Sequence, residues 1–429
     1  MNKIEILGAK ETLYVEHLDN GLDIYMIPNN KVKNYYVTLN TKFGSIHTDF
    51  EYDGKDYSLP NGIAHFLEHL TFNLPDENAF EHFSNLGASV NAFTSYDVTC
   101  YEVFANSRFK ENVEYLIKYV YTPYYTKELV NSEKGVILEE VKMYKDRPGI
   151  QVVNGIFDNL YINDKHQFLV GGTIDDVKDI KLEDIEIAYK AFYHPENMFM
   201  ILTGDFNPEE AVAIINDSMN KFTFDEYIKP VLKKVNEPFK IKTEYSEKEM
   251  NVDKYKVSFG VKIPKNNFKS LKLSKVEIKM YLNLISRINF GRTSILLEEL
   301  TDNSIISDEI STMLIETEDC YVQVFIASTD YPDYLIKKLK DVYDNLSVSE
   351  EEIERKVKST LSSFILMFDS IEYTNGEIQD DVIEYGQYLS DVYSIYKKLN
   401  IDTANDVIDC LEKRLCSVSV IKPKEKKEL

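Results

Sequence analysis

The stretch His65-Phe66-Leu67-Glu68-His69 decides how this chain of 429 residues is interpreted. It places two histidines four positions apart and a glutamate three positions after the first histidine. On an α-helix, positions i, i+3 and i+4 share one face, so both imidazoles can reach one metal ion and the carboxylate can reach water beside it. This His-x-x-Glu-His order occurs in zinc peptidases. We therefore expect His65 and His69 to bind Zn²⁺ and Glu68 to act on water.

The residues around the motif favour a helix. Pro60, Asn61 and Gly62 form a plausible start signal, and an apolar stripe with offsets of three, four and seven residues follows it. An isolated histidine is more often a hydrogen-bonded packing residue than a metal ligand. Here the two histidines avoid the stripe and come as a pair with a glutamate, which favours the metal interpretation. The stripe consists of Ile63, Phe66, Leu67 and Leu70.

A zinc hydrolase needs three protein ligands and one open position. A second helix expected over residues 132–144 offers Glu133, Glu139 and Glu140. Glu133 and Glu140 are seven positions apart and share a face, whereas Glu139 points about 100° away from Glu140. Spacing alone leaves Glu133 and Glu140 as equal candidates. The plain alternative is a solvated acidic helix surface.

Several motifs together resemble one family of enzymes. They are similar to the pitrilysin/insulinase family of inverzincin metallopeptidases, and most similar to its short bacterial members, which resemble the mitochondrial processing peptidase subunits. The likeness covers essentially the first half of the chain. The motifs that carry it are residues 61–73, 85–94, 133–140, 171–173 and 194–198.

The resemblance implies a fold and assigns the remaining site residues. It implies an α+β protein with two homologous halves, each a mixed or antiparallel sheet packed by helices, enclosing a chamber. It implies Glu140 as the third zinc ligand and Glu133 as an assisting carboxylate. It also implies that Asn91, Ala92 and Phe93 lie on an edge strand that pairs with an extended peptide substrate. The alternative for these three residues is an ordinary strand of the sheet.

Short strings recur in the two halves of the chain. Three landmarks of the first half reappear about 220 positions later, each in a strand followed by an amphipathic helix. We therefore expect a zinc-bearing N-terminal domain over residues 1–225, a linker over 226–250, and a homologous C-terminal domain over 251–429. The second domain has no paired histidines near residues 280–290, so we expect no metal site in it. The recurring pairs are Cys100-Tyr101 with Cys320-Tyr321, Val103-Phe104 with Val324-Phe325, and 115–118 with 334–337.

One departure from the family concerns an Arg/Tyr pair. Active members carry these residues in the second half, where they hold the substrate carbonyl. The matching segment here, residues 294–307, contains neither an arginine nor a tyrosine. We therefore expect a zinc endopeptidase subunit that hydrolyses short or unfolded peptides with a metal-bound water and works with a homologous partner, as a heterodimer or a homodimer. The alternative is a non-catalytic assembly subunit of the same fold.

The composition of the chain limits which binding partners and which cellular compartment we expect. A formal net charge of −23 excludes nucleic acid as the expected ligand and suits basic peptides. Four cysteines without ligand spacing indicate reduced thiols. The polar start of the chain and the absence of a long apolar run argue against a signal peptide and a membrane span. We therefore expect a cytoplasmic protein.

Overall fold

A computed structural model describes residues 1–424, which form two compact units. The first unit consists of Met1–Val141, Leu169–Lys233 and Ser363–Tyr393. The second contains the remaining described residues, beginning with Lys142–Phe168 and Lys234–Ser362. The chain passes from the first unit to the second at residue 234, inside the expected linker, but each unit also takes one segment from the other half of the sequence.

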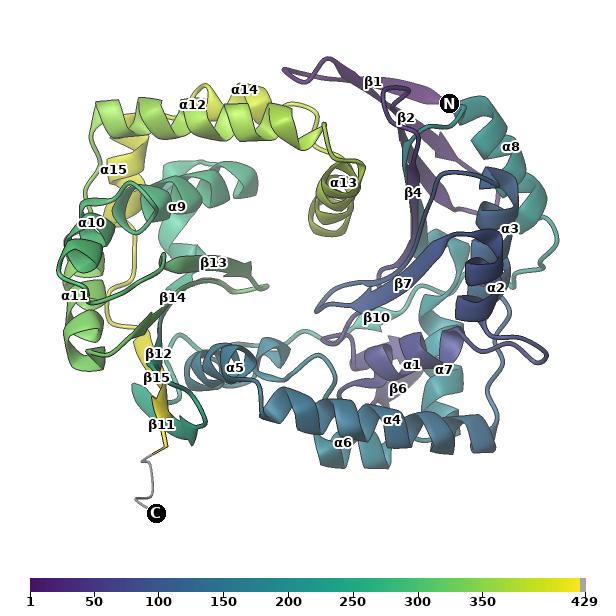
Figure 1. The fold of residues 1–429 in the computed structure, drawn as a ribbon, viewed down its shortest axis with the longest axis horizontal. Helices are drawn as coiled ribbons and strands as arrows, with labels where there is room; N and C mark the ends of the chain where they lie inside the picture. Colours follow the sequence, from purple (N-terminus) through teal and green to yellow (C-terminus); the bar gives the residue numbers. More distant parts are fainter. Residues whose placement is uncertain (425–429) are drawn as a thin grey trace. The chain divides into compact units, whose positions relative to one another are not determined.

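The first unit is built on a seven-stranded sheet with the order β1-β2-β3-β9-β4-β8-β7. Helices cover both faces of this sheet, with α13 on one face and α2, α3 and α8 on the other (Figure 1). A smaller sheet has the order β10-β5-β6. The strands are β1 (Asn2–Ile6), β2 (Glu11–His17), β3 (Asp23–Pro28), β4 (Tyr35–Thr41), β5 (Asp49–Tyr52), β6 (Lys55–Ser58), β7 (Ser89–Thr94), β8 (Thr99–Ala105), β9 (Met198–Gly204) and β10 (Val231–Leu232).

The helices that belong to the first unit in whole or in part are α1 (Ile63–Thr71), α2 (Ala79–Leu86), α3 (Phe109–Val120), α4 (Lys127–Lys145), α6 (Ile174–Asp179), α7 (Leu182–Phe192), α8 (Pro208–Met219), the end of α12 (Glu350–Met367), α13 (Ile371–Tyr385) and the start of α14 (Val392–Tyr396), with the short 3₁₀ turn η2 (Pro195–Asn197).

Strand β4 shows how alternating residues form the two faces of the large sheet. Val37 and Leu39 are almost fully buried in the main apolar core of the unit. Thr38 and Asn40 point to the opposite face, because successive side chains of a strand alternate. There they meet α13, whose Asn375 accepts a hydrogen bond from Thr38 over 3.0 Å, while α13 also donates to Asn40. Buried polar pairs therefore fix α13 on the sheet.

The second unit contains a five-stranded sheet with the order β11-β15-β12-β14-β13. Its strand directions repeat those of β3-β9-β4-β8-β7: the first pair is parallel and the next three pairs are antiparallel. This match confirms two homologous α+β halves. The strands are β11 (Tyr245–Met250), β12 (Tyr255–Pro264), β13 (Ser311–Glu316), β14 (Cys320–Thr329) and β15 (Cys416–Pro423).

Helix α5 packs on one face of this second sheet, and the apolar core lies on the other face beneath α9, α10, α11 and α15. Helix α9 falls between β12 and β13, as α1 falls between β4 and β7, and it carries no histidine. The helical segments are α5 (Pro148–Leu160), η1 (Lys165–Gln167), η3 (Lys265–Leu271), α9 (Lys275–Asn289), α10 (Ile295–Asp302), α11 (Pro332–Asp344), α12 (Glu350–Met367), α14 (Val392–Tyr396) and α15 (Ile401–Asp409).

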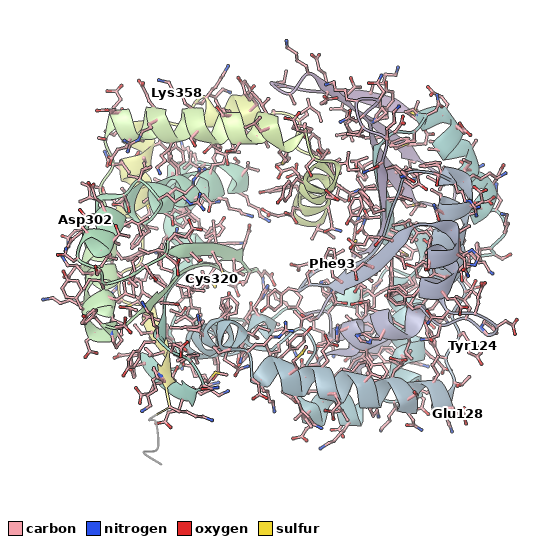
Figure 2. All side chains as sticks on the ribbon, viewed as in Figure 1. Phe93, Tyr124, Glu128, Asp302, Cys320 and Lys358 are labelled. Atoms are coloured by element: carbon pink, nitrogen blue, oxygen red, sulfur yellow. The ribbon has the colours of Figure 1, made fainter. Side chains whose placement is uncertain are left out.

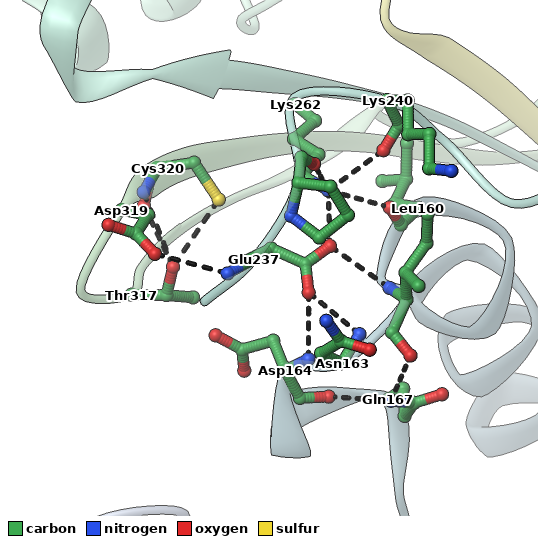
Figure 3. Close-up of polar contacts among 12 residues, drawn as sticks. Leu160, Asn163, Asp164, Gln167, Glu237, Lys240, Lys262, Thr317, Asp319 and Cys320 are labelled. Carbon is green, nitrogen blue, oxygen red and sulfur yellow. Dashed lines mark hydrogen bonds and ion pairs between the residues drawn. The ribbon is translucent and has the colours of Figure 1, made fainter. Parts of the chain in front are cut away.

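A buried ion pair joins three separate segments of the second unit (Figure 3). The ammonium group of Lys262 on β12 pairs with Glu237 and donates to the carbonyl of Leu160 at the end of α5, over 3.2 Å. The carboxylate of Glu237 in turn accepts backbone N–H groups from residues 162–164. Both charges are therefore fully hydrogen-bonded, which a buried pair requires.

The segment expected to be a linker, residues 226–250, is partly ordered into strands. Val231–Leu232 form β10, and Tyr245–Met250 form β11 at the edge of the second sheet. The chamber expected between the two halves stays a prediction. Within residues 1–424, no helix is both long and apolar enough to cross a lipid bilayer.

Candidate active site

Helix α1 carries the two histidines, and a glycine sets its start. Gly62 precedes the helix with a φ of +84°, in the left-handed region that favours glycine. A Cβ atom on Gly62 would lie 2.5 Å from the carbonyl oxygen of Gly171. A Cβ on Gly172, whose φ is +72°, would lie 2.5 Å from the carbonyl oxygen of Asn61. The two backbone segments thus approach so closely that only glycine fits.

Both faces of α1 are covered. The predicted apolar stripe, from Ile63 to Leu70, is completely buried. The opposite face is also largely enclosed, with His65 8% and Glu68 7% exposed. The covering elements are α4, which approaches the histidines, and β7, which contacts Glu68. His65 and Glu68 are therefore almost shielded from solvent, whereas His69 and Glu140 are only partly buried.

Three side chains converge as a metal site requires. One donor atom from each of His65, His69 and Glu140 can be chosen so that all three lie within 4.8 Å of one another. A carboxylate oxygen of Glu140 lies 3.7 Å from Nε2 of His65 and 3.4 Å from Nε2 of His69. These separations exceed a normal N–H···O distance. They are close to the roughly 3.4 Å edge of a tetrahedron with zinc–ligand bonds of about 2.0–2.1 Å. The donor set and its spacing therefore fit Zn²⁺.

The other two glutamates of α4 differ in position. A carboxylate oxygen of Glu133 lies 3.7 Å from Nδ1 of His69. Glu140 approaches the other ring nitrogen of His69, Nε2. Glu139 is exposed. Spacing in the sequence left Glu133 and Glu140 as equal candidates, and in the structure only Glu140 lies near both histidines.

His65 is held beside the glycine turn. Its Nδ1 is buried and has no hydrogen-bond partner within the described residues. A Cβ on Gly171 would lie 3.5 Å from this atom, so the ring packs directly on the glycine backbone. In the sequence, Gly171 and Gly172 are recognisable only as part of a motif. Their contact with α1 cannot be predicted from it, because the contact joins segments more than a hundred residues apart.

Burial and charge shift the pKa values of the three motif residues in different directions. Burial, reinforced by His69, lowers the pKa of His65 to about 4. Burial also disfavours the charged form of His69, but the nearby carboxylates of Glu133 and Glu140 outweigh it and raise its pKa to about 9. Burial raises the pKa of Glu68 to about 7, against the opposing effect of a hydrogen bond from Thr94. A carboxyl group with a pKa near neutrality is suited to general acid–base work.

Thr94 is a site residue that the sequence did not single out. Its hydroxyl donates to Oε2 of Glu68 over 2.7 Å. Thr94 is the last residue of β7, and α1 packs against this strand. The alternation of β7 could have suggested it, because Thr94 shares a face with Ala92 and a strand has only two faces.

Strand β7 lies at the edge of the seven-stranded sheet, as predicted for an edge strand. The three residues expected to bind substrate do not share a face, because they are consecutive in a strand. Ala92 faces the α1 side with Thr94, whereas Asn91 and Phe93 face the other side. The Phe93 side chain is 39% exposed, and Figure 2 labels it on β7.

The second unit places no arginine or tyrosine in the segment 294–307, most of which forms α10. Arg287, upstream on α9, donates to Thr360 over 2.6 Å. Arg292 forms an ion pair with Glu309. Neither arginine belongs to the matching segment.

Comparisons with known proteins identify the class of this chain. Residues 33–167 match the family model described as insulinase, peptidase family M16, and residues 179–360 match the model described as the peptidase M16 inactive domain. The chain belongs to the M16 family of peptidases. A Bacillus subtilis protein named as the uncharacterised zinc protease YmfH is 31% identical over 413 residues, which are 94% of this chain and 95% of that protein.

Another relative and several solved structures extend the comparison. The probable zinc protease PqqL of Escherichia coli is 30% identical over 239 residues, which are 50% of this chain and 24% of PqqL. An M16-like peptidase from Alicyclobacillus acidocaldarius has the same fold, with a TM-score of 0.90 and 23% identity over 96% of this chain and 99% of that one.

Two further structures share the fold at lower identity. The periplasmic protease PqqL of Escherichia coli has a TM-score of 0.73 and 19% identity over 99% of this chain but 48% of PqqL. A chain of complex III2 from Candida albicans has a TM-score of 0.72 and 14% identity over 95% of both chains.

Proposed function

We propose that this chain is a zinc-dependent endopeptidase subunit that hydrolyses short or unfolded peptides. The observation that carries the proposal is the convergence of His65, His69 and Glu140 beside the buried carboxyl group of Glu68. Two imidazoles and one carboxylate form a catalytic zinc set that leaves a coordination position open. The family membership and the zinc-protease names of its relatives support the same reaction.

Each residue has a defined role in this proposal. When bound, Zn²⁺ supplies Lewis acidity and lowers the pKa of a coordinated water to about 7. Glu68 accepts the proton of the attacking water and delivers it to the leaving amine. Thr94 orients the Glu68 carboxylate through its hydrogen bond.

Glu133 and β7 complete the site. The Glu133 carboxylate, close to Nδ1 of His69, orients that ring for metal binding. The free edge of β7 binds the substrate as an additional strand, which places a peptide backbone next to Thr94 and Glu68. Backbone pairing of this kind accepts many sequences, which suits a peptidase of extended chains.

The direct test combines metal analysis with peptide hydrolysis. We expect about one Zn²⁺ per chain in the wild type and in Glu68→Gln, with hydrolysis reduced about 10³-fold or more in the variant. Glu139→Gln, an exposed neighbour of the third ligand, is the control and should keep both properties. Full activity of Glu68→Gln with zinc retained would contradict the role of Glu68.

We further propose that the chain works with a homologous second subunit. The segment 294–307 lacks the Arg/Tyr pair, and this chain aligns with 48% of PqqL, whose length therefore accommodates two such chains. A heterodimer in which this chain bears the metal would supply the missing pair, and a homodimer is the alternative arrangement. Ordinary enzyme turnover by the purified, zinc-loaded monomer would refute the need for a partner.

The alternative is a non-catalytic assembly subunit. Its support is the absent Arg/Tyr pair and the shared fold with a chain of complex III2. This alternative predicts no hydrolysis with any homologous partner, even when one zinc is bound per chain.

The proposed cytoplasmic location can be checked by cell fractionation.

A further inference from the structure

Glu102 lies one strand in from the edge of the seven-stranded sheet. It belongs to β8 and pairs across the sheet with Asn91 on β7 and Thr38 on β4. Cross-strand partners share a face. Glu102 therefore faces the same side as Asn91 and the exposed ring of Phe93, away from α1.

Two neutral donors hold this carboxylate. Asn91 donates its side-chain amide to Oε1 over 3.0 Å, and the Tyr36 hydroxyl donates to Oε2. No lysine, arginine or histidine forms an ion pair with Glu102 in the part of the chain that the structure describes. A partly buried carboxylate without a cation has lost hydration that two neutral donors only partly replace.

A second carboxylate, that of Glu372, also acts on the Tyr36 hydroxyl. Burial raises the pKa of Tyr36, and the adjacent carboxylates of Glu102 and Glu372 raise it further. Glu372 is exposed near the start of α13, the helix that covers β4 on this side of the sheet. Two carboxylates, those of Glu102 and Glu372, therefore act near Tyr36 on this side of the sheet.

Substrate addition to β7 brings a side chain to this carboxylate. A peptide strand beside β7 aligns one of its residues with Asn91 and directs that side chain to the same face. Its backbone then lies about 10 Å from β8, two strand spacings away. The Glu102 carboxylate lies between Tyr36 on β4 and Asn91 on β7, and its Oε1 is within 3.0 Å of the Asn91 amide. A long side chain beside Asn91 can therefore reach Oε1, while a short one cannot.

We propose that Glu102 determines specificity by binding the lysine or arginine side chain of a substrate residue aligned with Asn91. The inference rests on the proposed peptidase function and on peptide pairing with β7. The next residue of the peptide on the same face meets Phe93, so an apolar residue fits there. Thr94, beside Glu68, is three residues further along β7, so the basic residue lies a few residues from the scissile bond.

The test compares pairs of fluorogenic peptides. In each pair, one peptide carries a lysine and the other carries Nε-acetyl-lysine at the same position, and successive pairs move this residue along the peptide. At one position, we expect wild-type kcat/KM to favour lysine on the order of tenfold. Glu102→Gln should remove this preference while still cleaving the acetylated peptide, and Glu102→Asp should partly retain it. Glu51→Gln, an exposed residue of β5, loses the same charge elsewhere and should keep the full preference.

A binding measurement separates this inference from the peptidase function. Fluorescence anisotropy with Glu68→Gln as the host reports peptide affinity without turnover, and Glu68→Gln/Glu102→Gln is the comparison. A lysine preference in binding that Glu102→Gln abolishes supports the subsite even if the wild type hydrolyses nothing. Equal kcat/KM and equal affinity of the wild type for the lysine and acetyl-lysine peptides at every position would overturn the inference. An undiminished lysine preference in Glu102→Gln would also overturn it. Either result would leave the peptidase function standing.

Discussion

Glu139 and Glu140 are adjacent in the sequence but occupy different surroundings, and this difference can be tested. Glu140 lies within 4 Å of both histidine rings, while Glu139 is exposed. Removing a negative oxygen ligand should weaken zinc binding far more than removing an exposed carboxylate that is not a ligand. We expect Glu140→Gln to lose zinc during dialysis against a weak chelator and Glu139→Gln to retain it, measured by metal analysis. The reverse result would exchange the two assignments.

Substitution of Glu133 should have an intermediate effect on zinc affinity. Its carboxylate approaches His69 from the side opposite to Glu140. Groups that orient a ligand without touching the metal commonly change affinity by about 10–100-fold. Zinc affinity of Glu133→Gln between those of the wild type and Glu140→Gln would support an orienting role, and an affinity as low as that of Glu140→Gln would indicate direct coordination.

At the scale of elements, the start of α1 depends on Gly62. Alanine there would bring its Cβ to 2.5 Å from a backbone oxygen at a φ of +84°. We expect Gly62→Ala to lower the free energy of unfolding by about 2 kcal/mol or more and to weaken zinc binding, because α1 carries both histidines. Thermal unfolding and a zinc titration measure the two effects.

Gly135 on α4 supplies the matched control for Gly62. A Cβ on Gly135 meets nothing within 4 Å, and the residue is exposed in the middle of a helix. Gly135→Ala should therefore leave zinc binding unchanged and stabilise the protein by about 0.5–1 kcal/mol. Equal destabilisation by the two substitutions would mean that the contact of Gly62 with the turn at Gly171 is unimportant.

Helix α13 gives a pH-dependent contribution to stability. Burial, with the neighbouring carboxylates of Glu377 and Glu384, raises the pKa of Asp381 to about 7, although the carboxylate accepts the backbone N–H of Leu389. Between about pH 4 and pH 7 the folded protein thus binds a proton that the unfolded chain has lost. The contribution of Asp381 to stability is greatest at low pH and falls as pH rises through about 7.

Asp381→Asn should remove this pH dependence, because the amide keeps an acceptor oxygen and carries no charge. We expect the variant to be more stable than the wild type by about 4 kcal/mol at pH 8 and nearly equal to it at pH 4. Denaturant unfolding of both proteins across this range gives the comparison. A variant that is less stable at pH 8 would show that the charged form is not penalised.

At the scale of the whole molecule, the net charge of −23 should affect how substrates arrive. A strongly acidic protein attracts cationic peptides over distances that salt screens. We expect kcat/KM for peptides rich in lysine and arginine to fall steeply between about 0.05 and 0.5 M salt, and kcat/KM for neutral peptides to change little. Hydrolysis assays at several salt concentrations provide the measurement. A kcat/KM for the basic peptides that does not change with salt would exclude electrostatic steering of the substrate.

Much of this molecule could be predicted from its sequence, because the decisive signals lie within single elements. The helical spacing of His65, Glu68 and His69 fixes one face of α1 without knowledge of any neighbour. The recurring strings predicted two homologous halves, and the sheets do repeat strand by strand. The absence of paired histidines in α9 follows from the sequence alone.

Only the tertiary structure could decide the contacts between elements that are distant in the chain. Glu140 lies closer to both histidines than Glu133 because α4 crosses α1 at one particular turn, and helical spacing cannot specify that turn. The hydrogen bond from Thr94 to Glu68, the approach of Gly171 to Gly62, and the hydrogen bond from Asn91 to Glu102 likewise depend on packing and register. Periodicity determines which residues share a face of a helix or strand, whereas the position of one element against another depends on side chains from many segments at once.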